Sequence, residues 1–88
     1  MKKGKIAISI DKSLLNKEIS IKGQVTKVTE TPGLYLINIK DSSNKEITVI
    51  VFKEDDLRLQ KDDLVQVEGT VKDYKGNLEI VAEKIEVY

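Results

Sequence analysis

The sequence predicts an all-β fold, a small five-stranded Greek-key barrel with a short helix or helical turn between its third and fourth strands. Apolar residues alternate with polar ones at a period of two over most of the chain, and β-branched residues crowd into these runs. Polar and glycine-containing segments separate the runs at turn positions. A chain of 88 residues is long enough for one hydrophobic core, so we expect a single domain over residues 1–88. Residues 1–5 carry no pattern, which is compatible with a disordered end.

The first main strand is expected from Ile19 to Thr29, with its apolar residues on one face. Gly23 interrupts this strand and indicates a bulge or sharp bend, through which one strand can pair with two neighbours and close a barrel. Thr31-Pro32-Gly33 forms a turn, with proline and glycine in the order that a type II turn favours. An edge strand over residues 6–10 and a turn over residues 11–17 are expected to precede this strand.

The second strand is expected at Leu34–Lys40 and the third at Glu46–Phe52, joined by a tight turn of polar residues. Ile37 and Ile39 share the inward phase of the second strand, and Tyr35 shares it too, which predicts a structural role for that ring. The third strand is apolar on both faces. One of its faces is therefore a candidate binding surface.

Residues 53–63 break the alternation, and their acidic residues followed by Leu57 predict at most a short helical turn. The fourth strand is expected at Leu64–Tyr74 and the fifth from Leu78 to about Tyr88. A hairpin turn at Lys75-Gly76-Asn77 joins them.

Composition excludes several classes of function. The chain has no cysteine and no histidine, which excludes disulfides, thiolate chemistry, zinc sites built from these residues and histidine acid–base catalysis. The pairs Asp55-Asp56 and Asp62-Asp63 lack a third ligand, so they are interpreted as solvated or capping charge rather than a magnesium site. No apolar run approaches the ~20 residues of a membrane span or resembles a secretory signal. We therefore expect a cytoplasmic protein that is not an enzyme and has no metal, no cofactor and no membrane partner.

The charge is unevenly distributed along the chain. Fifteen basic and fifteen acidic residues give a net charge of zero, but residues 1–45 hold nine basic and four acidic residues. Residues 46–88 hold six basic and eleven acidic residues. The neutral total lowers the expectation of a polyanionic partner without removing it, because the lysines of the first half can gather on one side of the folded surface.

Five segments follow one another in a recognisable order: Ile21-Lys22-Gly23-Gln24-Val25, Ile39-Lys40-Asp41, Glu46-Ile47 through Phe52, Leu64 through Val71, and Tyr74-Lys75-Gly76-Asn77-Leu78. Together they resemble the OB-fold nucleic-acid-binding modules of replication protein A and of archaeal single-stranded DNA-binding proteins. A more distant likeness is to the anticodon-binding barrels of aspartyl- and lysyl-tRNA synthetases. The resemblance covers roughly residues 18–88 and implies the OB-fold barrel more firmly than it implies a function.

The resemblance also implies a set of binding residues. In the family, the outward aromatic residue at the end of the third strand stacks on a base, and that position is Phe52 here. A polar or basic residue early in the same strand contacts nucleic acid. Thr48 takes this place, where some modules carry arginine. Family modules place an aromatic residue at the start of the fifth strand, where this chain has Leu78. Tyr74 across the hairpin could substitute for it.

Residue type and outward phase add the other candidates. Leu36 and Ile50 would form a groove floor with Thr48, and Asn38 could hydrogen-bond a base edge. The further rim candidates, which could contact phosphates or bases, are Lys27, Lys40, Lys45, Lys75 and Asn77. Local packing is the alternative role for the rings of Phe52 and Tyr74.

The expected function is non-catalytic binding of single-stranded nucleic acid, DNA in preference to RNA, in replication or repair. The partner is that strand, with protein partners or a larger parent protein as further possibilities. Three tyrosines, one phenylalanine and no tryptophan predict micromolar affinity and a shallow salt dependence. The alternative is a protein-docking barrel within a larger complex, and a third reading is tRNA anticodon recognition. Lysines around the outer face of the second and third strands favour nucleic acid, whereas an acidic or uncharged rim favours a protein partner.

Overall fold

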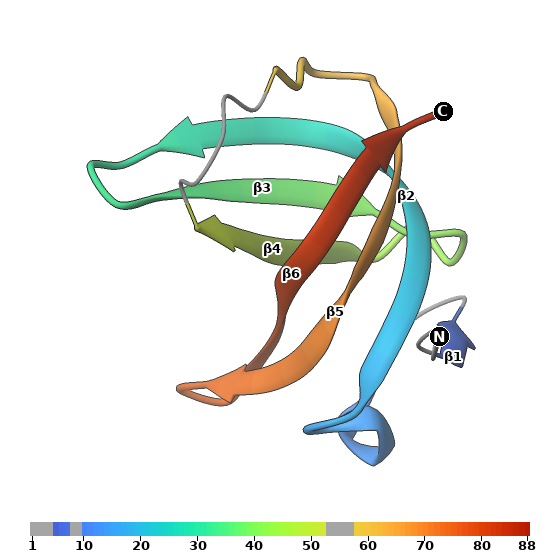
Figure 1. The fold of residues 1–88 in the computed structure, drawn as a ribbon. Helices are drawn as coiled ribbons and strands as arrows, with labels where there is room; N and C mark the ends of the chain where they lie inside the picture. The colour runs from blue at the N-terminus through green and yellow to red at the C-terminus, as the bar shows by residue number, and fades with distance from the viewer. Residues whose placement is uncertain (1–4, 8–9, 53–57) are drawn as a thin grey trace.

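The computed structural model describes residues 5–7, 10–52 and 58–88. These residues form six strands and one 3-10 turn (Figure 1). The elements are β1 (Lys5–Ala7), η1 (Lys12–Leu14), β2 (Glu18–Glu30), β3 (Leu34–Lys40), β4 (Glu46–Phe52), β5 (Leu64–Tyr74) and β6 (Asn77–Val87).

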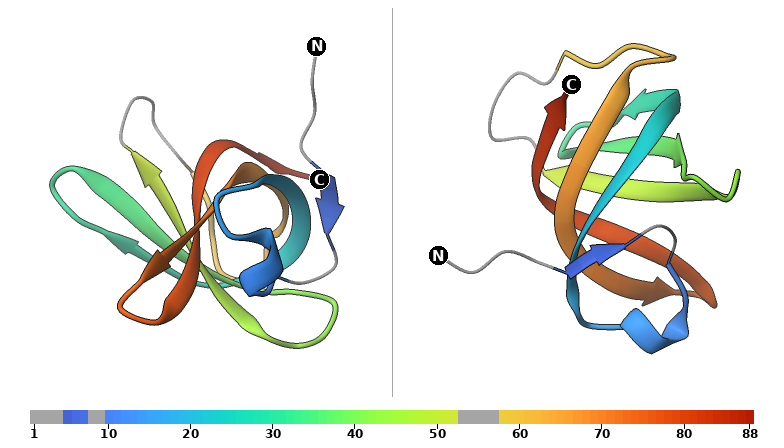
Figure 2. Two further views of the ribbon diagram at one scale, coloured as in Figure 1. Left: turned by 90° about the horizontal axis from the view of Figure 1, so that it is seen from below. Right: turned by 90° about the vertical axis from the view of Figure 1, so that its right-hand side faces the viewer.

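Five of the strands close into a barrel. The strand order is β1-β2-β3-β4-β6-β5, and β5 pairs back with β2, so β2 to β6 leave no gap in the ring. Strands β4 and β6 meet in parallel at Thr48–Ile50, whereas the other barrel pairs are antiparallel. Strand β1 pairs in parallel with the first half of β2, outside the ring (Figure 2). The predicted five-stranded Greek-key barrel, the OB-fold, is confirmed.

Strand β2 bends and pairs with two neighbouring strands. Its residues 18–24 pair with β5 and its residues 24–30 with β3. A Cβ added to Gly23 would lie 2.8 Å from Ile39 Cδ1 and 2.9 Å from the carbonyl oxygen of Lys40, so only glycine fits this crossing. The predicted change of partner occurs at Gly23 and Gln24, and the bulge itself follows at Thr26, between Val25 and Lys27.

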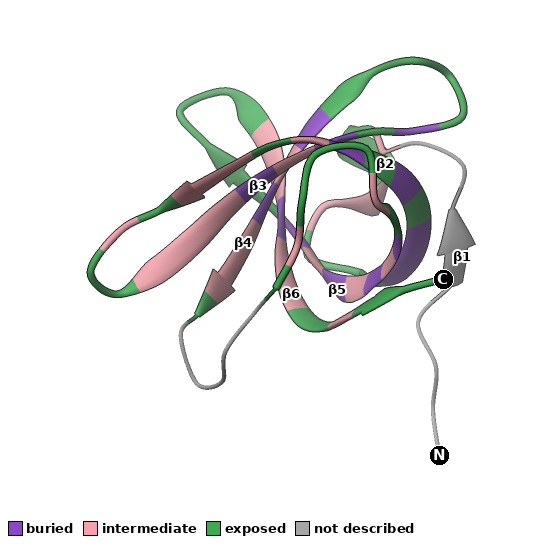
Figure 3. Ribbon diagram, turned by 90° about the horizontal axis from the view of Figure 1, so that it is seen from above, coloured by how far each residue is buried: buried purple, intermediate pink, exposed green. Residues whose placement is uncertain are grey.

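The core consists of isoleucine and valine side chains that point into the barrel. From Ile21 to Val25 of β2, buried residues alternate with exposed ones (Figure 3), as a strand with one face in water requires. Ser20 is also buried, at the point where β1 pairs with β2. Two further segments, η1 through Leu14 and residues 58–63 through Leu59, pack against this core. The fully or nearly fully buried set is Ile19, Ile21, Val25, Ile37, Ile39, Ile47, Val49, Val65, Val67, Val71 and Ile80.

The predicted strand boundaries agree with the structure to within one residue for the five barrel strands. The edge strand expected over residues 6–10 is β1 at Lys5–Ala7, and the expected turn over residues 11–17 contains η1, capped by Asp11. The helical turn expected over residues 53–63 falls partly on residues 53–57, which lie outside the described residues, as do Asp55-Asp56, Leu57 and residues 1–4. Residues 58–63 contain a turn at Lys61-Asp62.

Two turns of the barrel differ in how they are held. Lys75 and Gly76 both have positive φ, 53° and 86°, which is the two-residue hairpin turn that right-twisted strands favour. The prediction of a type II turn at Pro32-Gly33 is wrong, because Gly33 does not adopt the positive φ that this turn requires. Thr31 closes the turn instead: its backbone N–H and its hydroxyl both donate to the carbonyl oxygen of Leu34, at 2.9 and 2.8 Å.

Candidate nucleic-acid interface

The outer face of β3 and β4 is built from register pairs. Outward residues of the two strands stand opposite each other as Leu34 with Phe52, Leu36 with Ile50, Asn38 with Thr48 and Lys40 with Glu46. The alternate residues, such as Ile37 and Val49, are buried in the core. The outward phase predicted for both strands is therefore what the structure has.

Strands β2 and β6 extend this face on either side. Lys27 stands opposite Asn38, and Glu79 stands beside Thr48, so a polar row crosses the barrel wall. Lys72 of β5 is in turn opposite Glu79. The row therefore carries a lysine at each end and hydrogen-bonding groups between them.

A second, mostly apolar row runs beside the first. Leu36 and Ile50 form its centre, with Val81 of β6 beside Ile50 and Thr29 of β2 opposite Leu36. Leu36, Ile50 and Val81 are each half-buried, so their side chains are covered on one side by the wall and open on the other. Such a strip is a floor on which a flat apolar ring can lie.

Phe52 ends this floor. Its side chain is 56% exposed, and it lies opposite Leu34, next to the turn between β2 and β3. The ring of Phe52 is therefore open to solvent at this end of the floor.

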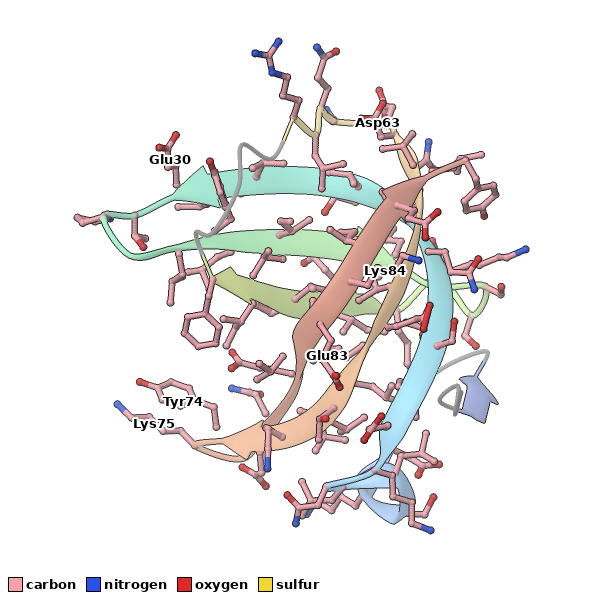
Figure 4. All side chains as sticks on the ribbon, viewed as in Figure 1. Glu30, Asp63, Tyr74, Lys75, Glu83 and Lys84 are labelled. Carbon is pink, nitrogen blue, oxygen red and sulfur yellow. The ribbon has the colours of Figure 1, made fainter. Side chains whose placement is uncertain are left out.

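Tyr74, Lys75 and Asn77 lie at the β5–β6 turn. Tyr74 is 57% exposed and stands opposite Asn77. The Lys75 amine lies 5.4 Å from the centre of the Tyr74 ring, a cation–π contact. Figure 4 shows both side chains projecting from the same turn. Because β6 meets β4 at Thr48, this turn lies near the start of β4 and Phe52 lies at its end, so the two rings approach the face from different ends.

A hollow of about 370 Å³ separates the start of β4 from the β5–β6 turn. Thr48, Asn77 and Glu79 line it together with Lys45 and Asp41 of the β3–β4 turn. Three predicted candidates, Thr48, Asn77 and Lys45, thus meet at one place. The hollow offers both hydrogen-bond donors and acceptors to a ligand on the face.

The rim of the face is mixed in charge. The lysines Lys27, Lys40 and Lys75 are exposed, as the nucleic-acid interpretation requires, but Glu46 and Glu79 also stand on this surface. The Glu46 carboxylate accepts a hydrogen bond from the hydroxyl of Thr26 at 2.8 Å. The surface therefore favours a partner that makes only a few phosphate contacts.

Several residues of the face were missed from the sequence, among them Thr29, Lys72, Glu79 and Val81. Glu79 and Val81 join it only through the parallel β4–β6 pairing, which no local pattern reveals. Thr29 was missed because the bulge at Thr26 reverses the alternation of β2. A strict period of two from Val25 would also have placed Lys27 inward.

Other kinds of site are not apparent in the described part of the chain. Residues 5–7, 10–52 and 58–88 contain no group of three acidic side chains that could hold a metal ion. Within the same ranges, no helix is long and apolar enough to cross a membrane.

Solved structures with the same barrel come from several kinds of protein. The chain is similar to a chain of the S. pombe Stn1-Ten1 complex, with a TM-score of 0.73 and 19% identity over 81% of this chain and 57% of that one. It is similar to a chain of a replication protein A heterotrimer bound to single-stranded DNA, with a TM-score of 0.73 and 14% identity over 84% of this chain and 58% of that one.

Asparaginyl-tRNA synthetase from Pyrococcus horikoshii gives a TM-score of 0.76 and 24% identity over 99% of this chain and 23% of that one. The present chain thus spans a little more than half of the first two chains and about a quarter of the synthetase. These likenesses show the fold. No curated protein matches the sequence.

The closed barrel, its outward face and the order of its strands agree with a family model that matches most of the chain. Residues 19–88 match the model of the OB-fold nucleic acid binding domain, and the chain belongs to this family.

Proposed function

We propose that this chain is a non-catalytic module that binds single-stranded DNA on the outer face of β3 and β4, in replication or repair. Bases stack on Phe52 and lie on the floor formed by Leu36 and Ile50. Asn38 and Thr48 hydrogen-bond base edges, and lysines at the rim contact phosphates. Tyr74, Lys75 and Asn77 contact the strand at the β5–β6 turn.

The observation that carries this proposal is the exposure of Phe52 at the end of the apolar row. A phenylalanine that is 56% exposed loses much of the free energy that burial would give it, about 25 cal/mol per Å² of apolar surface left in water. A base stacked on the ring recovers it, and such contacts are worth roughly 1–3 kcal/mol each. Membership of a nucleic-acid-binding family supports a base as the occupant.

DNA is proposed over RNA because of the replication protein A likeness, in which the related chain is part of an assembly bound to single-stranded DNA. The synthetase likeness supports anticodon binding within a longer protein instead. A comparison of the two sugars separates these readings, since only RNA offers a 2′-hydroxyl.

The test is fluorescence anisotropy with labelled oligo-dT and oligo-rU of about 12 nucleotides, within the site sizes of OB barrels. The wild-type protein is compared with Phe52→Ala and Phe52→Leu at two salt concentrations. We expect micromolar, salt-sensitive binding that weakens about tenfold in Phe52→Ala. Phe52→Leu keeps apolar surface without a flat ring, so it should also weaken binding if stacking is the cause. Equal affinity of wild type and Phe52→Ala would contradict the proposed site.

The second candidate function is docking of a protein partner on the same face. Its support is the apolar strip of Leu36, Ile50 and Val81 beside a rim of mixed charge, and the likeness to a chain of the Stn1-Ten1 complex. If neither oligonucleotide binds at protein concentrations of hundreds of micromolar, this second function replaces the first.

A further inference from the structure

A continuous row of outward residues leads from the candidate face around the barrel. Lys40 on β3 stands opposite Gln24 on β2, and Gln24 stands opposite Leu64 on β5. The backbone N–H of Tyr88 donates to the carbonyl oxygen of Leu64 at 3.0 Å. The row Lys40, Gln24, Leu64 and Tyr88 therefore follows the barrel wall away from the proposed stacking floor, starting at a residue of that face.

This row borders a second hollow. Its volume is about 250 Å³, and its lining includes Lys22, Lys40, Ser42, Asn44 and Tyr88. Among the described residues that line this hollow, the one acidic side chain is that of Asp41. It is buried, and its Oδ1 accepts hydrogen bonds from the backbone N–H groups of Ser43 and Lys45. Two exposed lysines thus face the solvent of this hollow. Hydroxyl and amide groups stand beside them, which is a donor set suited to a phosphate.

An exposed aromatic ring completes the hollow. Tyr88 is 59% exposed and Leu64 beside it is 45% exposed. The Lys22 amine lies 5.0 Å from the centre of the Tyr88 ring. The same pairing of an exposed tyrosine with a lysine amine occurs at Tyr74 and Lys75, at 5.4 Å. An open ring next to a cation can take a base on the ring and its phosphate on the amine.

We propose that the hollow around Lys22 and Tyr88 is a second strand-binding site, which takes the continuation of a single strand that already occupies the β3–β4 face. Lys40 joins the two sites, Lys22 and Lys40 contact phosphates, and Tyr88 with Leu64 receives a base. This inference rests on the proposed function. A single strand is its ligand because the row is continuous with that face and because the exposed charged side chains among the described lining residues are two lysines.

The two sites are well separated along the barrel. Phe52 and Glu46 mark opposite ends of β4, and Lys40 stands opposite Glu46. At about 3.3 Å per residue, the β4 strand alone is about 20 Å long. An oligonucleotide near the lower limit of ~4 nucleotides per OB barrel can occupy one site, whereas one of about 12 nucleotides can reach both. The effect of the second site should therefore depend on length.

The experiment measures anisotropy of oligo-dT of about 5 and about 12 nucleotides with wild type, Tyr88→Ala, Tyr88→Phe and Lys22→Gln. Lys12→Gln is the matched charge control, because Lys12 is exposed on η1 and absent from both hollows. We expect Tyr88→Ala to weaken binding of the longer strand about tenfold and of the shorter strand less than about twofold. Tyr88→Phe should bind like wild type, and Lys22→Gln should weaken the longer strand about threefold with a shallower salt slope.

Failure of this inference is distinguishable from failure of the proposed function. If the longer strand binds and its binding is weaker in Phe52→Ala but not in Tyr88→Ala, the second site is overturned and the proposed site on the β3–β4 face is kept. The same holds if both lengths lose equal affinity in Tyr88→Ala, since this shows a general loss rather than a second site. If no strand binds to the wild-type protein, both proposals are overturned.

Discussion

Gly69 and Val81 bring the backbones of β5 and β6 into contact closer than any side chain allows. A Cβ added to Gly69 would lie 2.3 Å from the carbonyl oxygen of Val81 and 2.8 Å from Cα of Ala82. The register of the two strands shifts at this point, between Glu68 and Gly69. Gly69 also stands opposite Ile19 of β2, so the tight contact lies where three strands meet.

We therefore expect Gly69→Ala to lower the free energy of unfolding by about 3 kcal/mol, because the clash is with backbone that cannot rotate away. Gly33→Ala is the control, since a Cβ there meets nothing within 4 Å and should change stability by less than about 1 kcal/mol. Urea denaturation followed by circular dichroism measures both. Similar stability of the two variants would mean that β5 and β6 can move apart at the register shift between Glu68 and Gly69.

Asp41 holds the turn between β3 and β4. Its Oδ1 accepts the backbone N–H of Ser43 at 2.8 Å and that of Lys45 at 3.0 Å, whereas its Oδ2 is buried without a hydrogen bond. Asp41→Ala leaves two N–H groups without their acceptor and should cost about 2 kcal/mol. Asp41→Asn keeps an oxygen for them and should cost less than half as much, measured in the same denaturation experiment. An equal cost would show that the negative charge, not the acceptor, holds the turn.

The salt dependence of oligonucleotide binding tests whether the rim lysines contact phosphates. If Lys27 contacts a phosphate, Lys27→Gln should weaken oligo-dT binding for every sequence and make the slope of log affinity against log salt shallower by about 0.7. The control is Lys84→Gln. Lys84 lies on β6 (Figure 4), and its amine forms an ion pair with Glu86 at 2.7 Å. The slope of this variant should stay at the wild-type value. Identical slopes for wild type and Lys27→Gln would remove Lys27 from the interface.

The cap of η1 gives a pH-dependent signal. The Asp11 carboxylate accepts hydrogen bonds from the hydroxyl and from the backbone N–H of Ser13. These two hydrogen bonds lower the pKa of Asp11 below its ordinary value. The resulting stabilisation of the turn is complete above the ordinary pKa and is lost as the pH falls through the lowered one. In Ser13→Ala the pKa of Asp11 should rise toward its ordinary value. A carboxyl titration followed by NMR measures this, and an unchanged pKa would mean that the Ser13 hydroxyl has no effect.

The sequence predicted the limits of the strands well because each strand is rich in β-branched residues and lies between polar or glycine-containing turn segments. Ile37 was placed inward on this pattern alone, and it is buried in the structure. The third strand is apolar on both faces, so the pattern did not choose between them, and the outward position of Phe52 was expected only from the family resemblance. Non-local features could not be found in the same way. The β4–β6 pairing that adds Glu79 to the face joins residues far apart in the chain.

Local exceptions also escaped the pattern. The bulge at Thr26 reverses the alternation of β2 by one residue, which a period of two cannot represent. The turn at Pro32-Gly33 has the composition of a type II turn, but it is held by hydrogen bonds between the Thr31 hydroxyl and the backbone of Leu34 instead. The extra residue of the bulge and the hydroxyl of Thr31 thus determine the local backbone, rather than the alternation of polarity or the composition of the turn.

The pairing of β2 with β5 has a consequence for how the barrel forms. Glu18 meets Thr70 and Gln24 meets Leu64, so the strands that close the ring are separated by about half of the chain. The hairpins β2–β3, β3–β4 and β5–β6 can form from neighbouring segments, but the ring cannot close until the loop between its ends has lost its conformational freedom. Folding should therefore be slow for so short a chain, in the range of milliseconds to seconds that is usual for small barrels dominated by long-range contacts. The first half of β2 can gain its antiparallel partner β5 only after this loop has closed.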